Sequence, residues 1–291
     1  GRFRQFVQCD IDILGDATNL AEIEEILALT KALKRICPDK AYTVRVNDRA
    51  ILKGMADYSG FPENETDKVF IILDKMDKIG LDGVREELLA EGYAPEAVEK
   101  YTGLLAEIQN DAAGVRALGE KLSGVMDPAK AENLATIMET VKAVADIEFG
   151  LEFDPTLVRG MGYYTGTIFE VSMEGFGGSV AGGGRYDKLI GKFTGVDTPA
   201  CGFSIGFERI ITILMDSGFK VPEAAGKKAF LYEKGLSGEQ FRAVLKKAQE
   251  ERANGTRVAV AQMNKNKKFQ KEQLAKDGYE EIVEFYKDSL K

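Results

Sequence analysis

The chain has 291 residues, of which 44% are hydrophobic and 30% are charged; it carries a net charge of -8 at pH 7 and contains no histidine. This length predicts two or three domains, and the charge argues against a protein that coats nucleic acid without specificity. Without histidine, imidazole acid–base catalysis and histidine-activated nucleophiles are excluded, so catalysis would have to use carboxylates, arginines, tyrosines or bound ions.

The first predicted element is a strand over residues 2–14, in which mostly apolar side chains alternate with mostly charged or polar ones. Alternation places successive side chains on opposite faces of a sheet. A solvated face of an antiparallel sheet would explain the polar set, and so would a sheet floor that holds a nucleotide base, its phosphates and an ammonium group. The face in question carries two arginines, an aromatic ring, an amide and two carboxylates: Arg2, Arg4, Phe6, Gln8, Asp10 and Asp12.

A helix with an apolar stripe is predicted next, with Asn19 as its N-cap. It is expected to cover the sheet. Beyond it, apolar runs predict strands over residues 42–46 and 69–73, with a short helix over residues 49–58 between them.

From about residue 74 to residue 145 the pattern becomes helical. Asp82, Pro95 and Pro128 each mark a helix start, because proline is favoured in the first turn and aspartate caps helix N-termini. We expect a helical insertion of modest size without chemistry of its own.

Strands return after residue 146, and polar residues gather among them. The predicted strands cover residues 147–153, 163–172, 179–183 and 200–205, followed by a helix over residues 206–215. A core built only for packing would not need so many polar side chains. Those among these strands are Arg159, Tyr163, Tyr164, Glu170, Arg185, Asp187, Glu208 and Arg209.

The C-terminal part follows a linker at residues 221–226 and alternates strands with helices. This alternation predicts a small α/β unit with a parallel sheet. Unlike the acidic remainder, this part is basic, most of all at KNKKFQKEQ over residues 265–273. That run is either a solvated helix face or a contact for nucleic-acid phosphates.

Two features bear on compartment and metals. No apolar run reaches the roughly 18 to 20 residues of a membrane-spanning helix, and no signal peptide is visible. The cysteines at 9, 37 and 201 are odd in number and lack CxxC spacing, so neither a disulfide framework nor a zinc site is predicted. We expect a cytoplasmic protein with no membrane partner and no metal held by His or Cys.

The glycine-rich stretch AGGGRYD, residues 181–187, matches neither GxGxxG nor GxxxxGK[ST]. Dinucleotide and Walker-type phosphate binding are therefore not supported. Consecutive glycines in a strand allow either close backbone packing or a ligand that lies flat against the sheet.

In order and spacing, three segments resemble the class II aminoacyl-tRNA synthetases, and specifically the histidyl-tRNA synthetase family. LVRGMGYYTGTIFEV at residues 157–171 and AGGGRYD look like two peptides peculiar to that family, and GFSIGFER at residues 202–209 looks like class II motif 3. RFRQFVQCDID at residues 2–12 is similar to the second half of motif 2. The resemblance covers essentially the whole chain.

The resemblance implies an α+β fold, with an antiparallel sheet flanked by helices. It assigns residues 1–73 and 146–218 to a class II catalytic core that is incomplete at its N-terminus, residues 74–145 to the helical insertion domain, and residues 219–291 to a small α/β domain similar to an anticodon-binding domain. Motif 1, the family's main dimer element, and the first half of motif 2 have no counterpart here, so part of the ATP site and of the dimer interface is expected to be missing.

The implied activity is ATP-dependent activation of histidine to histidyl-adenylate and transfer to tRNA(His), with Mg²⁺ and with a homodimer in the full-length protein. An ionised carboxylate attacks the α-phosphorus in line, so the reaction needs positioning and charge neutralisation rather than a general base. The alternative is an inactive paralogue, such as the histidine-sensing regulatory subunit of ATP phosphoribosyltransferase. That family typically lacks the anticodon domain and degrades the catalytic peptides.

The resemblance also assigns roles to residues. Arg159 would be the catalytic cation at the α-phosphate. Phe6 would stack under adenine, Arg2 would face ATP, and Arg209 would reach the triphosphate. Gln8 and Asp12 would hold the carboxylate and ammonium of histidine and Tyr164 would help to recognise its imidazole, within a histidine-binding set completed by Tyr163, Gly183 and Arg185.

Overall fold

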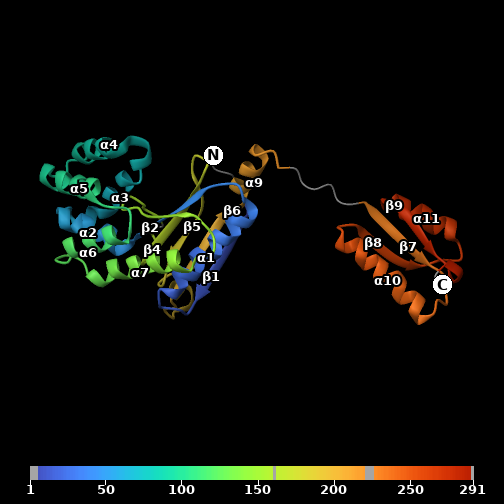
Figure 1. The fold of residues 1–291 in the computed structure, drawn as a ribbon. Coiled ribbons are helices and arrows are strands. Elements are labelled where there is room, and N and C mark those ends of the chain that lie inside the picture. The colour runs from blue at the N-terminus through green and yellow to red at the C-terminus, as the bar shows by residue number, and fades with distance from the viewer. Residues whose placement is uncertain (1–5, 160–161, 220–225, 290–291) are drawn as a thin grey trace. The chain divides into compact units, whose positions relative to one another are not determined.

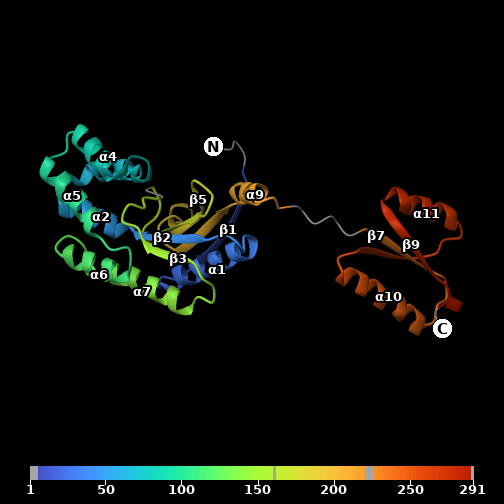
Figure 2. The ribbon, with the colours of Figure 1, turned by 45° about the horizontal axis from the view of Figure 1, so that its top comes forward.

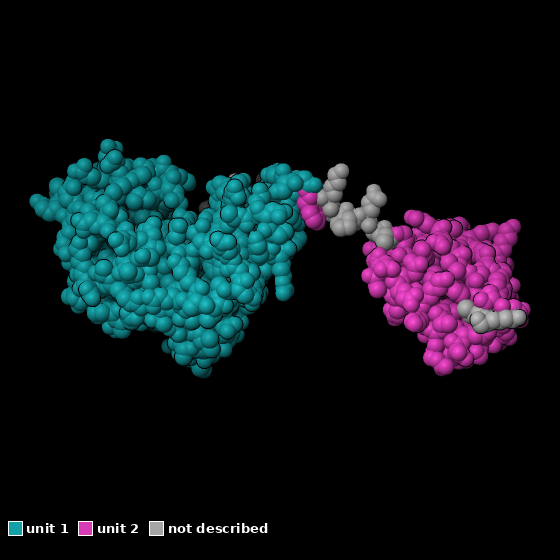
Figure 3. All heavy atoms as spheres, viewed as in Figure 1, with its two compact units in different colours: residues 1–218 teal, residues 219–291 magenta. Residues whose placement is uncertain are grey.

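The computed structural model describes residues 6–159, 162–219 and 226–289. The chain divides into two compact units, residues 1–218 and residues 219–291 (Figure 3). Arg2 and the start of the predicted first strand lie outside the described residues, as does most of the predicted linker. Within the described ranges, no helix is long and apolar enough to span a membrane.

Unit 1 is built on a six-stranded sheet with the order β1-β6-β5-β4-β2-β3 (Figure 1). Neighbouring strands are antiparallel except for β2 and β3, which are parallel. The mainly antiparallel sheet with flanking helices confirms the predicted α+β class. The strands are β1 (Gln8–Leu14), β2 (Tyr42–Asp48), β3 (Gly150–Phe153), β4 (Thr167–Met173), β5 (Ser179–Arg185) and β6 (Ala200–Gly206).

Two helices, α1 (Leu20–Ile36) and α7 (Pro128–Val144), cover one face of this sheet (Figure 2). Most of the apolar stripe of α1 is buried there, including Leu29 and Leu33, whereas Leu20 at its start is exposed. We call this the back face; on β6 it carries the buried side chains of Cys201, Phe203 and Ile205. The opposite face, which carries Ser204 and the intervening glycines of β6, is the front face.

The helix starts of unit 1 agree in part with the prediction, because Pro95 and Pro128 open their helices whereas Asn19 makes no side-chain capping bond at α1. Asp127 accepts a hydrogen bond from the Ala129 amide at the start of α7, and Asp48 accepts one from Ala50 at the start of α2. Such bonds satisfy backbone donors that have no partner inside the helix. The other elements are α2 (Arg49–Ser59), the 3-10 turn η1 (Glu63–Glu65), α3 (Thr66–Leu73), α4 (Met76–Ala90), α5 (Pro95–Glu107), α6 (Ala112–Lys121), α8 (Gly191–Thr194) and α9 (Phe207–Asp216).

The predicted strand over residues 69–73 is wrong, because these residues belong to α3. A short run of purely apolar residues shows no usable periodicity. In the structure only Ile71 points outward, 51% exposed, while its neighbours on both sides are buried. The helix that was expected to start at Asp82 is the second part of α4, because the non-helical Gly80 divides the range Met76–Ala90 into two helical segments and the second begins close to Asp82.

Unit 2 has a three-stranded parallel sheet with the order β8-β7-β9, as predicted. Its small core contains Phe230, Val244 and Phe285. A capping box between Ser237 and Gln240 begins its first helix. Its elements are β7 (Lys227–Tyr232), α10 (Gly238–Ala253), β8 (Arg257–Gln262), α11 (Lys267–Lys276), β9 (Tyr279–Phe285) and the 3-10 turn η2 (Lys287–Ser289).

Candidate functional site

A polar row crosses the front face of the six-stranded sheet. Strand register places Arg45, Glu170, Gly182, Ser204 and Asp10 opposite one another on successive strands. Residues directly opposite each other in antiparallel strands share a face. The alternation seen in the first strand therefore continues across the sheet as a polar floor.

A cleft of about 630 Å³ opens over this floor, between the sheet and α9. Four of the predicted site residues line it: Phe6, Gln8, Arg159 and Arg209. Small-molecule sites are usually clefts of roughly 300 to 1,000 Å³. The structure thus brings together residues that are widely separated in the sequence, in a space large enough for a small ligand.

Arg159 lies flat against the floor. Its Nε donates to Glu170, whose other oxygen accepts a 3.1 Å bond from Arg45, and its Nη2 donates to Ser179 Oγ at 3.0 Å. A Cβ at position 182 would stand 2.4 Å from Nη1 of Arg159. An alanine at position 182 would therefore force the Arg159 guanidinium to shift, so the glycine lets this arginine pass close to the sheet.

Arg209, in the first turn of α9, points at the same hydroxyl. Its Nη1 donates to the Ser179 carbonyl and, at 3.0 Å, to Ser179 Oγ. Among the described residues it has no carboxylate partner; the neighbouring Glu208 instead accepts the Val7 amide at 2.7 Å. Two guanidinium groups thus meet at one hydroxyl. Glu170 is bound to Arg159 and Glu208 also lines the cleft, so it is the unused guanidinium donors that suit an anion.

The other end of the floor is neutral or acidic. Gln8 Nε2 donates to Ser204 Oγ at 2.6 Å, and the Tyr186 hydroxyl donates to Asp12. Asp12 leans over Gly202, where a Cβ would stand 2.0 Å from its Oδ1. Burial and the bond to Asp12 both raise the pKa of Tyr186, so it remains a donor. Asp12 lies on the front face but does not line the cleft.

Tyr163 and Tyr164 lie before β4, which begins at Thr167 rather than at residue 163 as predicted. Their ring centroids are 4.3 Å apart. Burial raises the pKa of Tyr164, and a hydrogen bond with Tyr163 raises it further. Neither ring is part of the cleft lining.

Gly183 and Arg185 lie on the back face, opposite Phe203 and Cys201 in the register. The structure therefore does not bring them to Gln8 and Arg159. Arg185 is 8% exposed, and its guanidinium donates to both carboxylate oxygens of Glu22 at 2.6 Å, while further bonds reach backbone carbonyls before α1. These bonds hold α1 against the sheet.

Sequence reasoning missed Ser179 and Ser204, whose hydroxyls contact the predicted ligand-binding side chains. The only signal in the sequence was a serine within a strand of small residues. Ser204 has the front-face parity of β6, whereas Ser179 shares the sequence parity of Gly183 and Arg185 and pairs with Ser172 through a register shift between β4 and β5. Serine is too common for that signal alone to indicate function.

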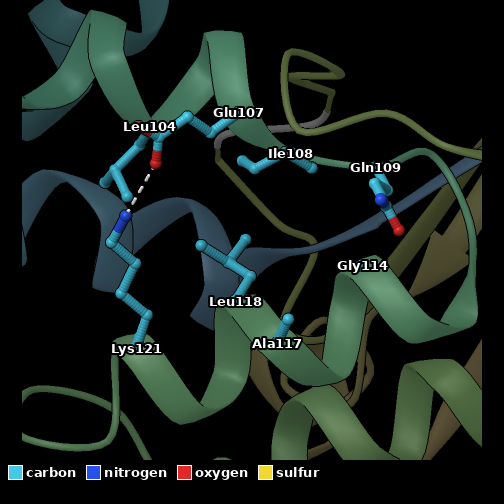
Figure 4. A pocket seen from close by; sticks show the side chains of 8 residues that line it. All are labelled: Leu104, Glu107, Ile108, Gln109, Gly114, Ala117, Leu118 and Lys121. Atoms are coloured by element: carbon cyan, nitrogen blue, oxygen red, sulfur yellow. Dashed lines mark hydrogen bonds and ion pairs between the residues drawn. The ribbon is translucent and has the colours of Figure 1, made fainter.

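Metal ligands and a second cleft add nothing to this site. Among the described residues, no cluster of three or more His, Cys, Asp or Glu could hold a metal ion. A smaller hollow of about 280 Å³ lies between α5 and α6 (Figure 4), and there the charges of Glu107 and Lys121 are already paired at 3.0 Å. The rest of its lining is Gln109 with Gly114 and the apolar side chains of Leu104, Ile108, Ala117 and Leu118.

A family model described as histidyl-tRNA synthetase matches residues 1–210. The chain belongs to the histidyl-tRNA synthetase family. A histidine–tRNA ligase of Leifsonia xyli is 45% identical over 232 residues, which cover 78% of this chain and 52% of that protein. One from Korarchaeum cryptofilum is 33% identical over 97% of this chain and 64% of the relative. The chain spans about half the length of most of the curated relatives it matches.

Solved structures agree with this membership. The histidyl-tRNA synthetase of Nostoc sp. PCC 7120 superposes with a TM-score of 0.71 at 27% identity, over 95% of this chain and 65% of that one. A Bacillus halodurans protein described as an ATP phosphoribosyltransferase regulatory subunit/histidyl-tRNA synthetase has a TM-score of 0.63 at 22% identity, over 97% of this chain and 68% of that one. That identity establishes a shared fold alone.

Proposed function

We propose that the front-face cleft binds ATP and histidine and forms histidyl-adenylate, as the ligase part of a histidine–tRNA ligase. The observation that carries the proposal is the convergence of Arg159 and Arg209 on one hydroxyl beside Phe6 and Gln8. Two cations with spare donors, an exposed aromatic ring and an amide are the groups that a nucleotide and an amino acid require together.

In this proposal the residues act by placement and charge. Phe6 stacks on adenine, Arg209 holds the triphosphate, and Arg159 neutralises charge that develops on the α-phosphate. The histidine carboxylate attacks the α-phosphorus, and the bond to pyrophosphate breaks, so no general base is needed. Mg²⁺, brought with ATP, would neutralise the remaining phosphate oxygens.

The amino acid is held at the other end of the floor. Gln8 and Asp12 bind the carboxylate and the α-ammonium group, with Tyr163 and Tyr164 beside the imidazole. A cationic substrate group favours the acidic end of the floor, away from the two arginines. A hydroxyl of tRNA(His) then attacks the activated carbonyl and AMP leaves.

Unit 2 is proposed to contact tRNA(His) through the basic start of α11, where Lys267 and Lys268 stand. Such a contact would be steered by charge and weakened by salt. Deleting residues 219–291 should weaken aminoacylation far more than adenylate formation; equal loss of both would contradict this role.

The whole protein is proposed to act as a cytoplasmic homodimer. No specific observation favours the regulatory alternative.

The test is histidine-dependent exchange of pyrophosphate into ATP by the full-length protein. Arg159→Ala should lower the exchange rate by on the order of 100-fold or more, since it removes a charge that acts on the transition state. Arg242→Ala, an exposed arginine of unit 2, is the matched control and should leave the rate unchanged. Near wild-type exchange by Arg159→Ala would contradict the assignment.

A further inference from the structure

Ser179, the first residue of β5, is the point at which the two arginines of the cleft meet. Its Oγ accepts from Arg159 Nη2 and from Arg209 Nη1, both at 3.0 Å, and its carbonyl also accepts from Arg209. The arginines come from different segments, one preceding β4 and the other on α9. One small side chain therefore links two arginines that share no other hydrogen-bond partner among the residues that the structure describes.

A hydroxyl is suited to this link. Its oxygen has two lone pairs and can accept two donors at once, and it adds no negative charge that would compete with a phosphate. Bonds from charged donors are also stronger than bonds between neutral groups. Ordering a long arginine side chain costs rotamer entropy, so a shared acceptor that already holds both arginines reduces the entropy that ligand binding must still remove.

Donors remain after these bonds are made. A guanidinium has five N–H donors, and among the described residues Arg209 uses only Nη1 while Arg159 uses Nε and Nη2. The free donors of both lie at a cleft whose lining includes both side chains. Ser179 thus fixes the spacing of the two cations without saturating either of them.

We propose that Ser179 is a positioning residue that holds Arg159 and Arg209 at the separation at which both engage the phosphates of one ATP molecule. This rests on the proposed function, because it presumes that the anion in the cleft is a nucleotide triphosphate. Ser179 acts through the arginines and does not contact the reacting atoms.

Ser172 supplies a matched control. It is the register partner of Ser179 on β4, but among the described residues its Oγ donates only to the Thr43 carbonyl, at 3.5 Å. Ser172→Ala and Ser179→Ala therefore remove the same atom from the same pair of strands. Backbone pairing does not depend on either hydroxyl, so any difference between the variants reflects the arginines.

The experiment titrates MgATP into the whole chain by calorimetry, with the unfolding temperature measured in parallel. Ser179→Ala should weaken ATP binding roughly tenfold or more, since hydrogen bonds to charged groups are lost at two arginines. Ser179→Thr, which keeps the hydroxyl, should restore binding, and Ser172→Ala should bind as the wild type does. All three variants should unfold at the wild-type temperature.

Several outcomes would overturn the proposal. These are wild-type affinity in Ser179→Ala, an equal loss in Ser172→Ala, a lowered unfolding temperature that Ser179→Thr does not restore, or no ATP binding by the wild type. If Ser179→Ala weakens ATP binding while the full-length protein shows no histidine-dependent exchange, the positioning role stands and the proposed function fails.

Discussion

Each face of the six-stranded sheet carries an arginine from one of the two family peptides. The two arginines differ in burial and in how many of their N–H donors are already bonded to protein. On the back face, Arg185 is buried and bonded to fixed protein acceptors, including both oxygens of Glu22. On the front face, Arg159 is about a third exposed and keeps free donors beside the cleft. An arginine whose donors are satisfied serves the fold, whereas one held in place with donors to spare is available to a ligand.

The largest effect should come from breaking the buried pair. Arg185→Ala leaves the Glu22 carboxylate, 1% exposed, without its partner, and such a change typically costs about 3 to 5 kcal/mol. Urea unfolding of the chain, followed by a signal of unit 1, measures this loss. Arg209→Ala, at an exposed position, should change the free energy of unfolding by about 0.5 kcal/mol or less. An Arg185→Ala variant with wild-type stability but no ATP binding would place Arg185 in the site instead.

The back face also predicts a dependence of stability on pH. Burial, and to a smaller extent the nearby charge of Asp12, raise the pKa of Glu25 from 4.5 to about 8, and neither of its oxygens has a hydrogen-bond partner. The folded state therefore holds this proton more tightly than the unfolded state does. Stability should be greatest below pH 4.5 for this group and fall as the pH rises towards 8, by about 1.4 kcal/mol per pH unit.

Glu25→Gln removes that titration and should flatten the decline. The measurement is the free energy of unfolding at several pH values between 5.5 and 8 for both proteins. If the wild type and Glu25→Gln declined in parallel, the buried carboxyl would not be the cause.

A smaller effect should follow from filling the space above the front-face floor. Gly182→Ala puts a methyl group where the Arg159 guanidinium lies, so the arginine must move, and ATP affinity should fall roughly tenfold, as expected for a displaced charged hydrogen-bond donor. Gly103→Ala, on α5, meets no atom within 4 Å and is the control. Calorimetric titration with ATP checks both; undiminished affinity in Gly182→Ala would show that the position of Arg159 over the floor is unimportant.

The smallest effect concerns the acidic end of the floor. Tyr186→Phe removes the donor that orients Asp12, so histidine affinity should fall by roughly threefold to tenfold while ATP affinity is unchanged. Tyr58→Phe, on α2, is the matched control. Histidine titration measures the change, and an equal loss of ATP affinity would indicate general damage rather than an orienting role.

Much of this arrangement follows from the sequence, but the assignment of faces does not. Alternation along β5 places Gly182 and Arg185 on opposite faces, but the predicted strand ended at residue 183, before Arg185. Which face holds the cleft depends on where α1 packs, and the partner that fixes Arg185 is Glu22, distant in the sequence. The family resemblance grouped Arg185 with the histidine-binding residues, because a sequence motif does not show to which face of a strand each side chain points.

Two further features could not be predicted for related reasons. The apolar run at residues 69–73 fits a buried helix as well as a buried strand, and only its surroundings decide between them. Ser179 has no distinguishing local pattern, because its role depends on two arginines that the fold brings to it. By contrast, alternation predicted the first strand. The family resemblance predicted one site for Phe6 and Gln8 of the motif 2 segment, Arg159 of the first family peptide and Arg209 of the motif 3 segment, and these four residues line one cleft.

The most direct test of the central claim, that the front face is the ligand-binding face, is a crystal structure of the chain with ATP and histidine. We predict phosphate oxygens within hydrogen-bond distance of both Arg159 and Arg209, and histidine beside Gln8 and Asp12. Phosphates bound elsewhere, with the two guanidinium groups still bonded only to the protein, would contradict it.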